Sequence, residues 1–336
     1  MNVNSVEHIS RLASFARGCS AMVQKPTALR KGNMICAVAP ASSESDFSEL
    51  NMGLAKLREL GFNVSLGECV AKLKTRGYLA GSDQERAKEL NEAFGEDKVD
   101  AVFCINGGYG TVRMLPYVDY DLIKRNPKIF LGYSDITALH AAINQRSDLV
   151  TFHGPMIAPE MGSEFTEFTT RWFLRAVQDT APLGELTNPS DGPIIKTINE
   201  GRASGRLVGG NLSLMASTMG TPYEIDTRNK ILFLEDTQEP PYRVDRDLTH
   251  LWLGKKLDEA AGIIVGEFTK YDLIDKGASL TLWDVLRDRI CESGKPGIYG
   301  LCCGHGKHHF TLPIGVETRL DATQGRVWIE ESATEP

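Results

Sequence analysis

Short apolar runs alternate with helical patterns along the first half of the chain. Phe47–Leu60 has the apolar spacing of a helix, and Ser82 followed by Glu85 predicts a capped helix over Ser82–Phe94. Continuous apolar strands that alternate with helices are typical of a parallel sheet covered on both faces, here a Rossmann-like one. The apolar runs that predict these strands are Met34–Ala39, Phe62–Leu66, Ala101–Ile105 and Ile129–Leu131.

The second half mixes strands and helices less regularly. A helical stretch over Glu160–Arg175 is followed by Pro182–Ile198, which is rich in Pro, Gly, Asn and Asp and predicts a domain connection. The strands predicted beyond it are Arg206–Val208, Ile231–Leu234, Ala261–Val265, Gly297–Cys302, Val316–Leu320 and Arg326–Ile329, with helices at Val244–Leu257 and Thr281–Ile290. We therefore expect a flexible leader over 1–30, an N-terminal α/β domain over 31–180, a linker over 181–200 and a C-terminal mixed α/β domain over 201–336.

Composition and charge narrow the class of protein. The chain has 336 residues, of which 42% are hydrophobic and 24% are charged, as in soluble globular proteins. A net charge of −7 without a long basic run argues against a nucleic-acid partner. No segment approaches the length of a membrane span, and the first 30 residues lack the apolar core of a secretory signal. We expect a cytoplasmic protein without a membrane partner.

Several cofactor classes lack their motifs. The first βα turn carries no G-x-G-x-x-G and the chain has no G-K-[ST], which disfavours a nicotinamide enzyme and a P-loop. Seven cysteines without a C-x-x-C pair suggest reduced thiols. His305, His308 and His309 lie close together, so a metal site remains an alternative, but no H-E-x-x-H motif supports it. We expect neither a metal nor a cofactor.

Ser134 is a candidate nucleophile. It follows the strand Ile129–Leu131 and a glycine, and it precedes the helix-like stretch Asp135–Gln145. A serine at a sharp strand-to-helix turn exposes its hydroxyl beside the backbone N–H groups of a helix N-terminus. Those features serve a nucleophile whose attack creates an oxyanion. The alternative is that Ser134 only caps the helix.

Three further groups follow predicted strands in the same way. They are the glycine turn over 106–110, the carboxylates Glu235 and Asp236, and His305 between two glycines. Ligands of open α/β sheets bind beyond the carboxyl ends of the strands. Backbone donors, a hydroxyl, a carboxylate and an imidazole are the groups that acyl transfer needs. His305 is the best general-base candidate, and Glu235, with Asp236 as its rival, would orient it. A structural glycine turn and a solvated acidic strand end are the alternatives.

In this order, the motifs resemble the LD-carboxypeptidases of serine peptidase family S66, which also includes the microcin C self-immunity peptidases. The resemblance runs from about Gly32 to about Gly315. Its pieces are Ile105–Gly110, Gly132–Thr137, His153–Met156, Gly209–Ser213, Leu234–Asp236 and Gly304–Gly306 leading into Leu312–Gly315.

The resemblance implies a Ser–Glu–His triad with Ser134 as nucleophile, His305 as general base and Glu235 as its orienting carboxylate. It implies an oxyanion hole from the backbone N–H groups of Gly108 and Asp135. The serine would belong to the N-terminal domain and the other two residues to the C-terminal domain, with the site between them and a homodimer as the assembly. Substrate contacts are expected from Tyr109, His153 and Asn211.

The implied activity is hydrolysis of the bond between the L-centre of a diamino acid and the terminal D-alanine of a murein tetrapeptide, in peptidoglycan recycling. Many carboxypeptidase members have arginine at the position of Asn106 and asparagine at that of His309, so the substrate is less firmly implied than the reaction. One alternative is cleavage of peptidyl- or aminoacyl-nucleotide conjugates, for which Trp172, Trp252 and Trp283 are available to stack the base. Another is a non-catalytic α/β protein that binds an anion at its glycine turns.

Overall fold

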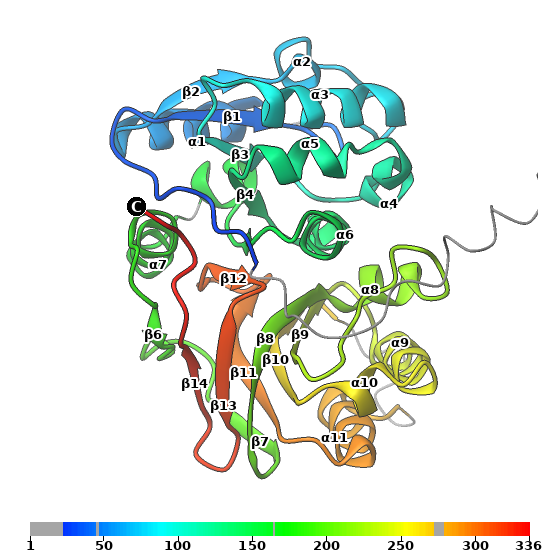
Figure 1. Ribbon diagram of the computed structural model, residues 1–336. Coiled ribbons are helices and arrows are strands. Elements are labelled where there is room, and N and C mark those ends of the chain that lie inside the picture. Colours follow the sequence, from blue (N-terminus) through cyan, green and yellow to red (C-terminus); the bar gives the residue numbers. More distant parts are fainter. Residues whose placement is uncertain (1–22, 45–46, 164, 272–278) are drawn as a thin grey trace, which may run out of the picture.

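The structure, a computed structural model, describes residues 23–44, 47–163, 165–271 and 279–336. Its mixed α/β fold is built on two sheets, and Figure 1 shows the N-terminal sheet above the C-terminal one. The expected fold class is therefore confirmed. None of the helices in the described ranges combines the length and the apolar character needed to cross a membrane.

The N-terminal sheet is buried on both faces. Side chains along β1 (Met34–Val38) alternate between two apolar cores, one containing the buried face of α1 (Phe47–Glu59) and the other that of α3 (Asp83–Gly95). Because both faces are covered, the strands are continuous apolar runs in the sequence. The strand order is β12-β5-β4-β3-β1-β2, and all neighbours except β12 and β5 pair in parallel. The remaining elements of this half are β2 (Asn63–Leu66), α2 (Glu68–Ala71), β3 (Ala101–Cys104), α4 (Thr111–Met114), η2 (Leu115–Tyr117), α5 (Tyr120–Arg125), β4 (Ile129–Gly132), η3 (Ser134–Ile136), α6 (Thr137–Ser147), β5 (Thr151–His153), η4 (Ile157–Met161) and α7 (Glu167–Gln178).

Local sequence signals explain two of these elements. The Ser82 side chain accepts a hydrogen bond from Glu85 N, and the Glu85 carboxylate accepts one from Ser82 N, so the predicted capping box begins α3. The helix expected over Glu160–Arg175 is different. Residues Ile157–Met161 form a π-helical turn, and α7 begins only at Glu167, where Thr166 caps it. That shift places Glu160 in the short π-helical turn.

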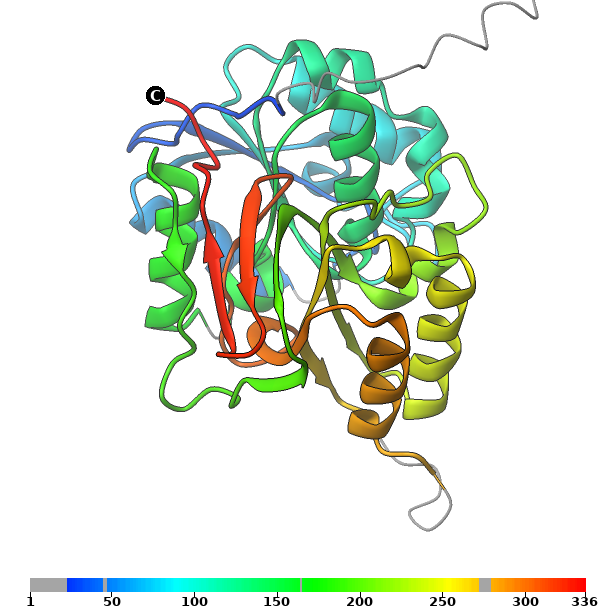
Figure 2. The same ribbon diagram turned by 60° about the horizontal axis from the view of Figure 1, so that its bottom comes forward.

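The C-terminal sheet has the strand order β6-β14-β13-β8-β9-β10-β11-β7, with a parallel centre from β8 to β11. Its edge strands pair antiparallel, and α9 and α11 pack side by side (Figure 2). The elements of this half are β6 (Gly184–Glu185), β7 (Lys196–Asn199), β8 (Arg202–Asn211), α8 (Leu212–Thr218), β9 (Ile231–Thr237), α9 (Pro241–Leu253), α10 (Lys256–Glu259), β10 (Gly262–Thr269), α11 (Leu282–Ser293), β11 (Gly297–Gly304), β12 (Leu312–Ile314), β13 (Glu317–Asp321) and β14 (Arg326–Ile329).

The chain crosses between the sheets more often than the expected domain boundaries allow. The expected linker 181–200 supplies β6 and β7, which form the two edges of the C-terminal sheet. Strand β12, from the expected C-terminal domain, pairs with β5 and completes the N-terminal sheet. Each sheet therefore includes a strand from a segment that the sequence assigns to another part of the chain.

Residues 23–30 are not flexible, contrary to the expectation of a flexible leader over 1–30. Gln24 forms a β-bridge with Leu149, Lys25 lies 2.9 Å from the carboxylate of Glu331, and Leu29 is buried. This segment is packed against the body of the protein, because its apolar side chains have a core to join. The rest of the expected leader, 1–22, lies outside the described residues.

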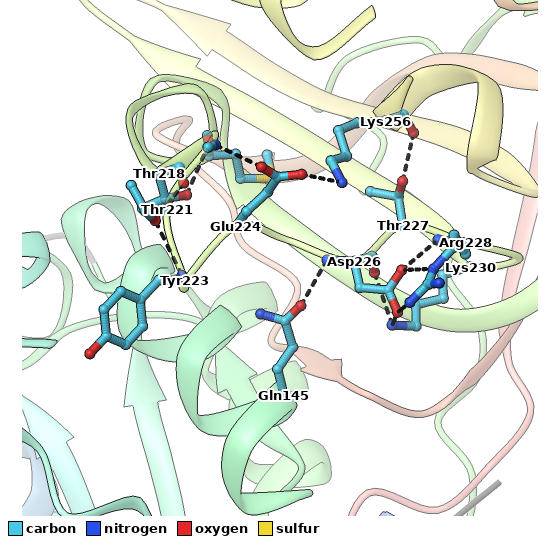
Figure 3. Close-up of polar contacts among 12 residues, drawn as sticks. Gln145, Thr218, Thr221, Tyr223, Glu224, Asp226, Thr227, Arg228, Lys230 and Lys256 are labelled. Atoms are coloured by element: carbon cyan, nitrogen blue, oxygen red, sulfur yellow. Dashed lines mark hydrogen bonds and ion pairs between the residues drawn. The ribbon is translucent and has the colours of Figure 1, made fainter. Parts of the chain in front are cut away.

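The loop between α8 and β9 ties the two halves together (Figure 3). The side-chain oxygen of Gln145 on α6 accepts a hydrogen bond from Asp226 N at 2.8 Å. The neighbouring Arg146 donates to the carbonyl of Pro222 at 2.8 Å and places its guanidinium 4.5 Å from the ring centre of Tyr223. These contacts hold α6, which follows the candidate nucleophile, against the half that carries the candidate acid and base.

Candidate active site

Ser134 occupies a strained turn between β4 and η3. Its φ of 63° lies in the left-handed region, which non-glycine residues rarely adopt. Gly132 makes the turn possible, because an added Cβ would lie 3.0 Å from Ile136 Cγ1 and 3.1 Å from Cys104 Cβ. The Ser134 side chain stays partly accessible, while Tyr133 and Asp135 on either side are buried. The geometry matches the sharp strand-to-helix turn that the sequence predicts.

The glycine turn lies directly against Ser134. A Cβ added to Gly107 would come 3.1 Å from Ser134 Cβ and 3.3 Å from its Oγ. Gly108 has a φ of 94°, and a Cβ there would lie 2.3 Å from Ser42 Oγ, so both conformation and space require glycine. Gly107 N–H donates to Asn106 Oδ1, whereas Gly108 N–H finds no acceptor among the described residues. Gly108 is therefore the better placed of the two to donate to a ligand.

Asp135 links the serine turn to the glycine turn. Its buried carboxylate accepts a hydrogen bond from Thr111 N at 2.8 Å, and its backbone carbonyl accepts one from Thr111 Oγ1 at 2.5 Å. Thr111 begins α4, directly after the glycine turn. The N–H groups in the first turn of a helix have no intrahelical acceptor, which leaves that of Asp135 available beside Ser134.

His305 and Glu235 form a direct pair. His305 Nδ1 lies 2.7 Å from Glu235 Oε2, and the Glu235 side chain is completely buried near the end of β9. Gly304 permits this approach, since a Cβ on it would lie 3.0 Å from Glu235 Oε2. Burial lowers the pKa of His305, but the charge and hydrogen bond of Glu235 outweigh it, so that the pKa is raised. With Nδ1–H donating to the carboxylate, Nε2 is left to accept a proton.

Asp236, the rival of Glu235, has other partners. Its carboxylate accepts hydrogen bonds from Asn211 Nδ2 at 2.9 Å and from Ser213 Oγ at 2.8 Å. Burial, followed by the charge of Glu235, raises the pKa of Asp236 to about 6. Asp236 therefore anchors the start of α8, and Glu235 is the carboxylate that contacts His305.

Ser134 and His305 line one pocket of about 670 Å³, which the expected oxyanion donor Gly108 also lines. The walls come from strand ends of both sheets and from the loops and helices that follow them, which agrees with the position that the sequence predicts for the site. The charged side chains that line the pocket alongside His305 are Glu160, Asp236, Glu239, Arg243 and Lys270.

The three expected substrate contacts fare differently. Asn211 lines the pocket, but its amide caps α8 and donates to Asp236. Tyr109 is half exposed and packs edge-on against Tyr78, outside the residues that line the pocket. His153 is completely buried against Tyr133 and Phe233, which corrects its expected role, because a side chain without accessible surface cannot contact a substrate.

The other two histidines of the 305–309 loop have partners of their own. His308 Nε2 lies 3.1 Å from Asp191, and its Nδ1 lies 3.1 Å from Thr166 Oγ1. His309 is buried with its ring centre 4.9 Å from that of Tyr133. Within the described ranges, no group of three or more His, Cys, Asp or Glu side chains is arranged to hold a metal ion.

Several pocket residues are not predicted from the sequence, among them Arg243, Lys270, Glu160 and Tyr133. The helical pattern places Glu160 at the start of a helix, and Tyr133 is part of the motif Gly132–Thr137 without a predicted role of its own. In the structure, Tyr133 Oη donates to Glu160 Oε1 at 2.6 Å, and the Tyr133 ring centre lies 4.8 Å from that of His305. A partly exposed acidic residue in a short π-helical turn carries no sequence signal, although such turns often occur at functional sites.

The pocket thus holds an alcohol on a strained turn, backbone N–H donors and an imidazole hydrogen-bonded to a buried carboxylate. Groups of these kinds can perform acyl transfer through a covalent intermediate.

Comparison with known proteins agrees with this chemistry. The LD-carboxypeptidase N-terminal domain family matches residues 35–154, and the LD-carboxypeptidase C-terminal domain family matches residues 204–320. A probable murein peptide carboxypeptidase of Bacillus subtilis is 42% identical over 320 residues, which cover 95% of this chain and 98% of the relative.

Two solved structures share the fold. The microcin C7 self-immunity protein MccF, in complex with glutamyl sulfamoyl guanosine, matches with a TM-score of 0.86 and 26% identity over 93% of this chain and 99% of the other. Muramoyltetrapeptide carboxypeptidase from Oxalobacter formigenes matches with a TM-score of 0.77 and 28% identity over 88% of this chain and 97% of the other. The chain is therefore a member of the LD-carboxypeptidase family, peptidase family S66.

Proposed function

We propose that this protein is a serine carboxypeptidase that releases the terminal D-alanine of murein tetrapeptides by hydrolysing its bond to the L-centre of the diamino acid. The observation that carries the proposal is the 2.7 Å contact between His305 Nδ1 and Glu235 Oε2 in a pocket that Ser134 also lines. The 42% identity to a probable murein peptide carboxypeptidase supports the choice of substrate.

In the proposed mechanism, His305 Nε2 takes the proton of Ser134 as its oxygen attacks the amide carbonyl. Glu235 keeps the imidazole in the required tautomer and stabilises the imidazolium. The backbone N–H groups of Gly108 and Asp135 hold the oxyanion. His305 then gives its proton to the amine of the leaving D-alanine, and the same residue activates the water that releases the acyl group from Ser134.

The charges of the pocket suit this substrate. A murein tetrapeptide ends in the carboxylate of D-alanine, and its diamino acid carries an ammonium group. Arg243 and Lys270 line the pocket as cations, and Glu160 and Glu239 line it as carboxylates, with Arg243 and Glu239 3.4 Å apart as an ion pair. The lining thus includes groups of opposite sign to each charge of the peptide. We assign the binding of the terminal carboxylate to Arg243 and Lys270.

The second candidate is cleavage of an aminoacyl-nucleotide conjugate, which the likeness to MccF bound to glutamyl sulfamoyl guanosine favours. The tryptophans that could stack a base have other neighbours: Trp172 packs on Phe310, Trp283 packs on Tyr299, and the guanidinium of Arg289 lies 5.2 Å from the ring centre of Trp252. Tyr133 is the aromatic residue among the described ones that line the pocket. This lining favours the peptide substrate.

A parallel assay separates the two candidates. Purified protein and its Ser134→Ala variant are each incubated with a murein tetrapeptide and with a glutamyl sulfamoyl nucleoside, and the products are measured by mass spectrometry. We expect the wild type to convert the tetrapeptide into tripeptide and D-alanine, and the variant to be inactive. Turnover of the conjugate alone would favour the second candidate, and an equally active variant would refute both.

We also propose that the protein acts as a homodimer in the cytoplasm, on the strength of the family resemblance. Light scattering on the purified protein tests the assembly, with a mass of twice the 37.0 kDa chain expected. A monomer across the micromolar range would refute it. Fractionation of cells that express the chain tests the compartment.

A further inference from the structure

Glu160 is a carboxylate of the pocket that takes no part in the catalytic steps proposed above. It belongs to the π-helical turn η4 and lines the same pocket as Ser134 and His305. Both of its oxygens are engaged. Oε1 accepts the Tyr133 hydroxyl at 2.6 Å, and Oε2 accepts Met156 N at 2.8 Å. These two hydrogen bonds hold the carboxylate in place and favour its charged form, whereas burial acts in the opposite direction and leaves the pKa of Glu160 above its ordinary value.

Tyr133 connects this carboxylate to both reacting side chains. It directly precedes Ser134 in the chain, and its ring centre lies 4.8 Å from the His305 ring. Because Tyr133 is buried and its hydroxyl is held by Glu160, the ring on which His305 rests cannot turn freely. A displacement of Glu160 would therefore change the positions of both Ser134 and His305 through Tyr133.

We infer that Glu160 is a positioning residue that acts through Tyr133: it fixes the ring of His305 and supplies a further negative charge that stabilises the imidazolium formed during catalysis. The effect on turnover rests on the proposed function, whereas the effect on His305 itself does not. Neither oxygen of Glu160 needs to touch the reacting atoms for this role.

The charges around His305 agree in sign. Glu235 and Asp236 on β9 and Glu160 on η4 are the carboxylates whose charge favours the protonated ring. His153 on β5 and His309, the imidazoles packed nearby, are kept neutral, because burial lowers the pKa of His153 well below its ordinary value and that of His309 to about 3. Burial also raises the pKa of Tyr133, so its phenol stays neutral and donates to Glu160. Charges at largely buried positions act more strongly on one another than charges at the surface.

The test is an NMR titration of the His305 ring in the wild type and in Glu160→Gln, without substrate. Glutamine keeps the size of the side chain and removes its charge. We expect the pKa of His305 to fall by about 0.5 unit or more in Glu160→Gln. The matched control is Glu239→Gln, which removes another carboxylate of the same pocket, one that pairs with Arg243. We expect a smaller shift in the pKa of His305 in this control.

Kinetics on the tetrapeptide give a second readout. We expect Glu160→Gln to lower kcat about tenfold or more, with KM changed less, and to move the acidic limb of the pH profile to lower pH. Tyr133→Phe keeps the charge of Glu160 and removes the tether, so it should lower kcat with a smaller change in the acidic limb. Glu160→Asp keeps the negative charge, so the pKa of His305 in this variant should lie between those of the wild type and Glu160→Gln.

An unchanged pKa of His305 in folded Glu160→Gln, or an equal shift in Glu239→Gln, overturns the inference. Circular dichroism establishes folding, and if Glu160→Gln does not fold, the kinetics of Tyr133→Phe decide: an unchanged kcat in this variant overturns the inference. Failure of the wild type to cleave the tetrapeptide would refute the proposed function alone, since the titration uses no substrate.

Discussion

His305 contacts Glu235 across 2.7 Å although 70 positions separate the two residues in the chain. Glu235 lies near the end of β9 and His305 directly after β11, and β10 stands between these strands in the sheet. The parallel strands bring both residues to one edge, and Gly304 clears the space between them. The order of the strands in the sheet thus brings the pair together. Ser134, which follows a strand of the other sheet, lines the same pocket as His305.

Replacement of Ser134 by alanine should abolish turnover and leave the fold intact. Loss of the nucleophile in a triad lowers kcat by about 10⁴-fold or more, while the deletion of one oxygen in a half-buried turn costs little stability. D-alanine release and thermal melting measure the two effects. Ser217→Ala, on the exposed side of α8, is the control and should remain active. Comparable activity of the two variants would contradict the assignment.

Gly108→Ala should lower kcat by about 10²-fold or more, the usual cost of losing one oxyanion donor. The added Cβ would lie 2.3 Å from Ser42 Oγ and displace the turn beside Ser134. Gly77→Ala is a matched control, since Gly77 also has a positive φ, of 63°, but no atom within 4 Å of the added Cβ. Steady-state kinetics of both variants check the prediction. Equal rates would show that the glycine turn does not take part in catalysis.

The pH profile should report the raised pKa of His305. A general base must be neutral, so kcat/KM should rise with pH through this pKa, with its midpoint above the ordinary value of about 6.5. Glu235→Gln removes the main source of the upward shift. The acidic limb should then move to lower pH while kcat falls by about 10⁴-fold, because the tautomer is no longer fixed.

Asp236→Asn is the matched control for Glu235→Gln, since Asp236 bonds to Asn211 and Ser213 and not to the imidazole. We expect a smaller loss of kcat and a smaller displacement of the acidic limb. A larger effect of Asp236→Asn than of Glu235→Gln would assign the orienting role to Asp236.

Arg146→Ala should loosen the contact between the two halves. The change removes the hydrogen bond to Pro222 and the cation–π contacts with Tyr120 and Tyr223, which together are worth about 1 kcal/mol at an exposed position. Denaturant unfolding measures the loss. Lys88→Ala, which removes only surface ion pairs, should change the free energy of unfolding less.

Much of the N-terminal sheet could be predicted from sequence because its strands are buried on both faces. Strands β1, β3 and β4 are short, continuous apolar runs, and the box of Ser82 and Glu85 determines where α3 begins. Strand β12 could not be predicted, because three residues with a proline in the middle have no periodicity and their partner β5 is far away in the chain.

The residues of the site also differ in how far a local sequence pattern indicates them. Ser134, Glu235 and His305 follow buried strands, and the carboxyl ends of parallel strands are the place where ligand sites form. Burial of His153 and the bond between Tyr133 and Glu160 depend on packing between distant segments, which no local pattern encodes. Sequence therefore finds residues that strand ends present and misses those that tertiary packing adds.

The most direct measurement is to locate the residue that a fluorophosphonate probe modifies, by peptide mapping with mass spectrometry after reaction with the wild type and with His305→Gln. The account predicts that the label in the wild type is on Ser134 and that His305→Gln reacts far more slowly, because the serine then lacks its base. A label on another residue, or equal labelling of Ser134 in both proteins, would contradict it.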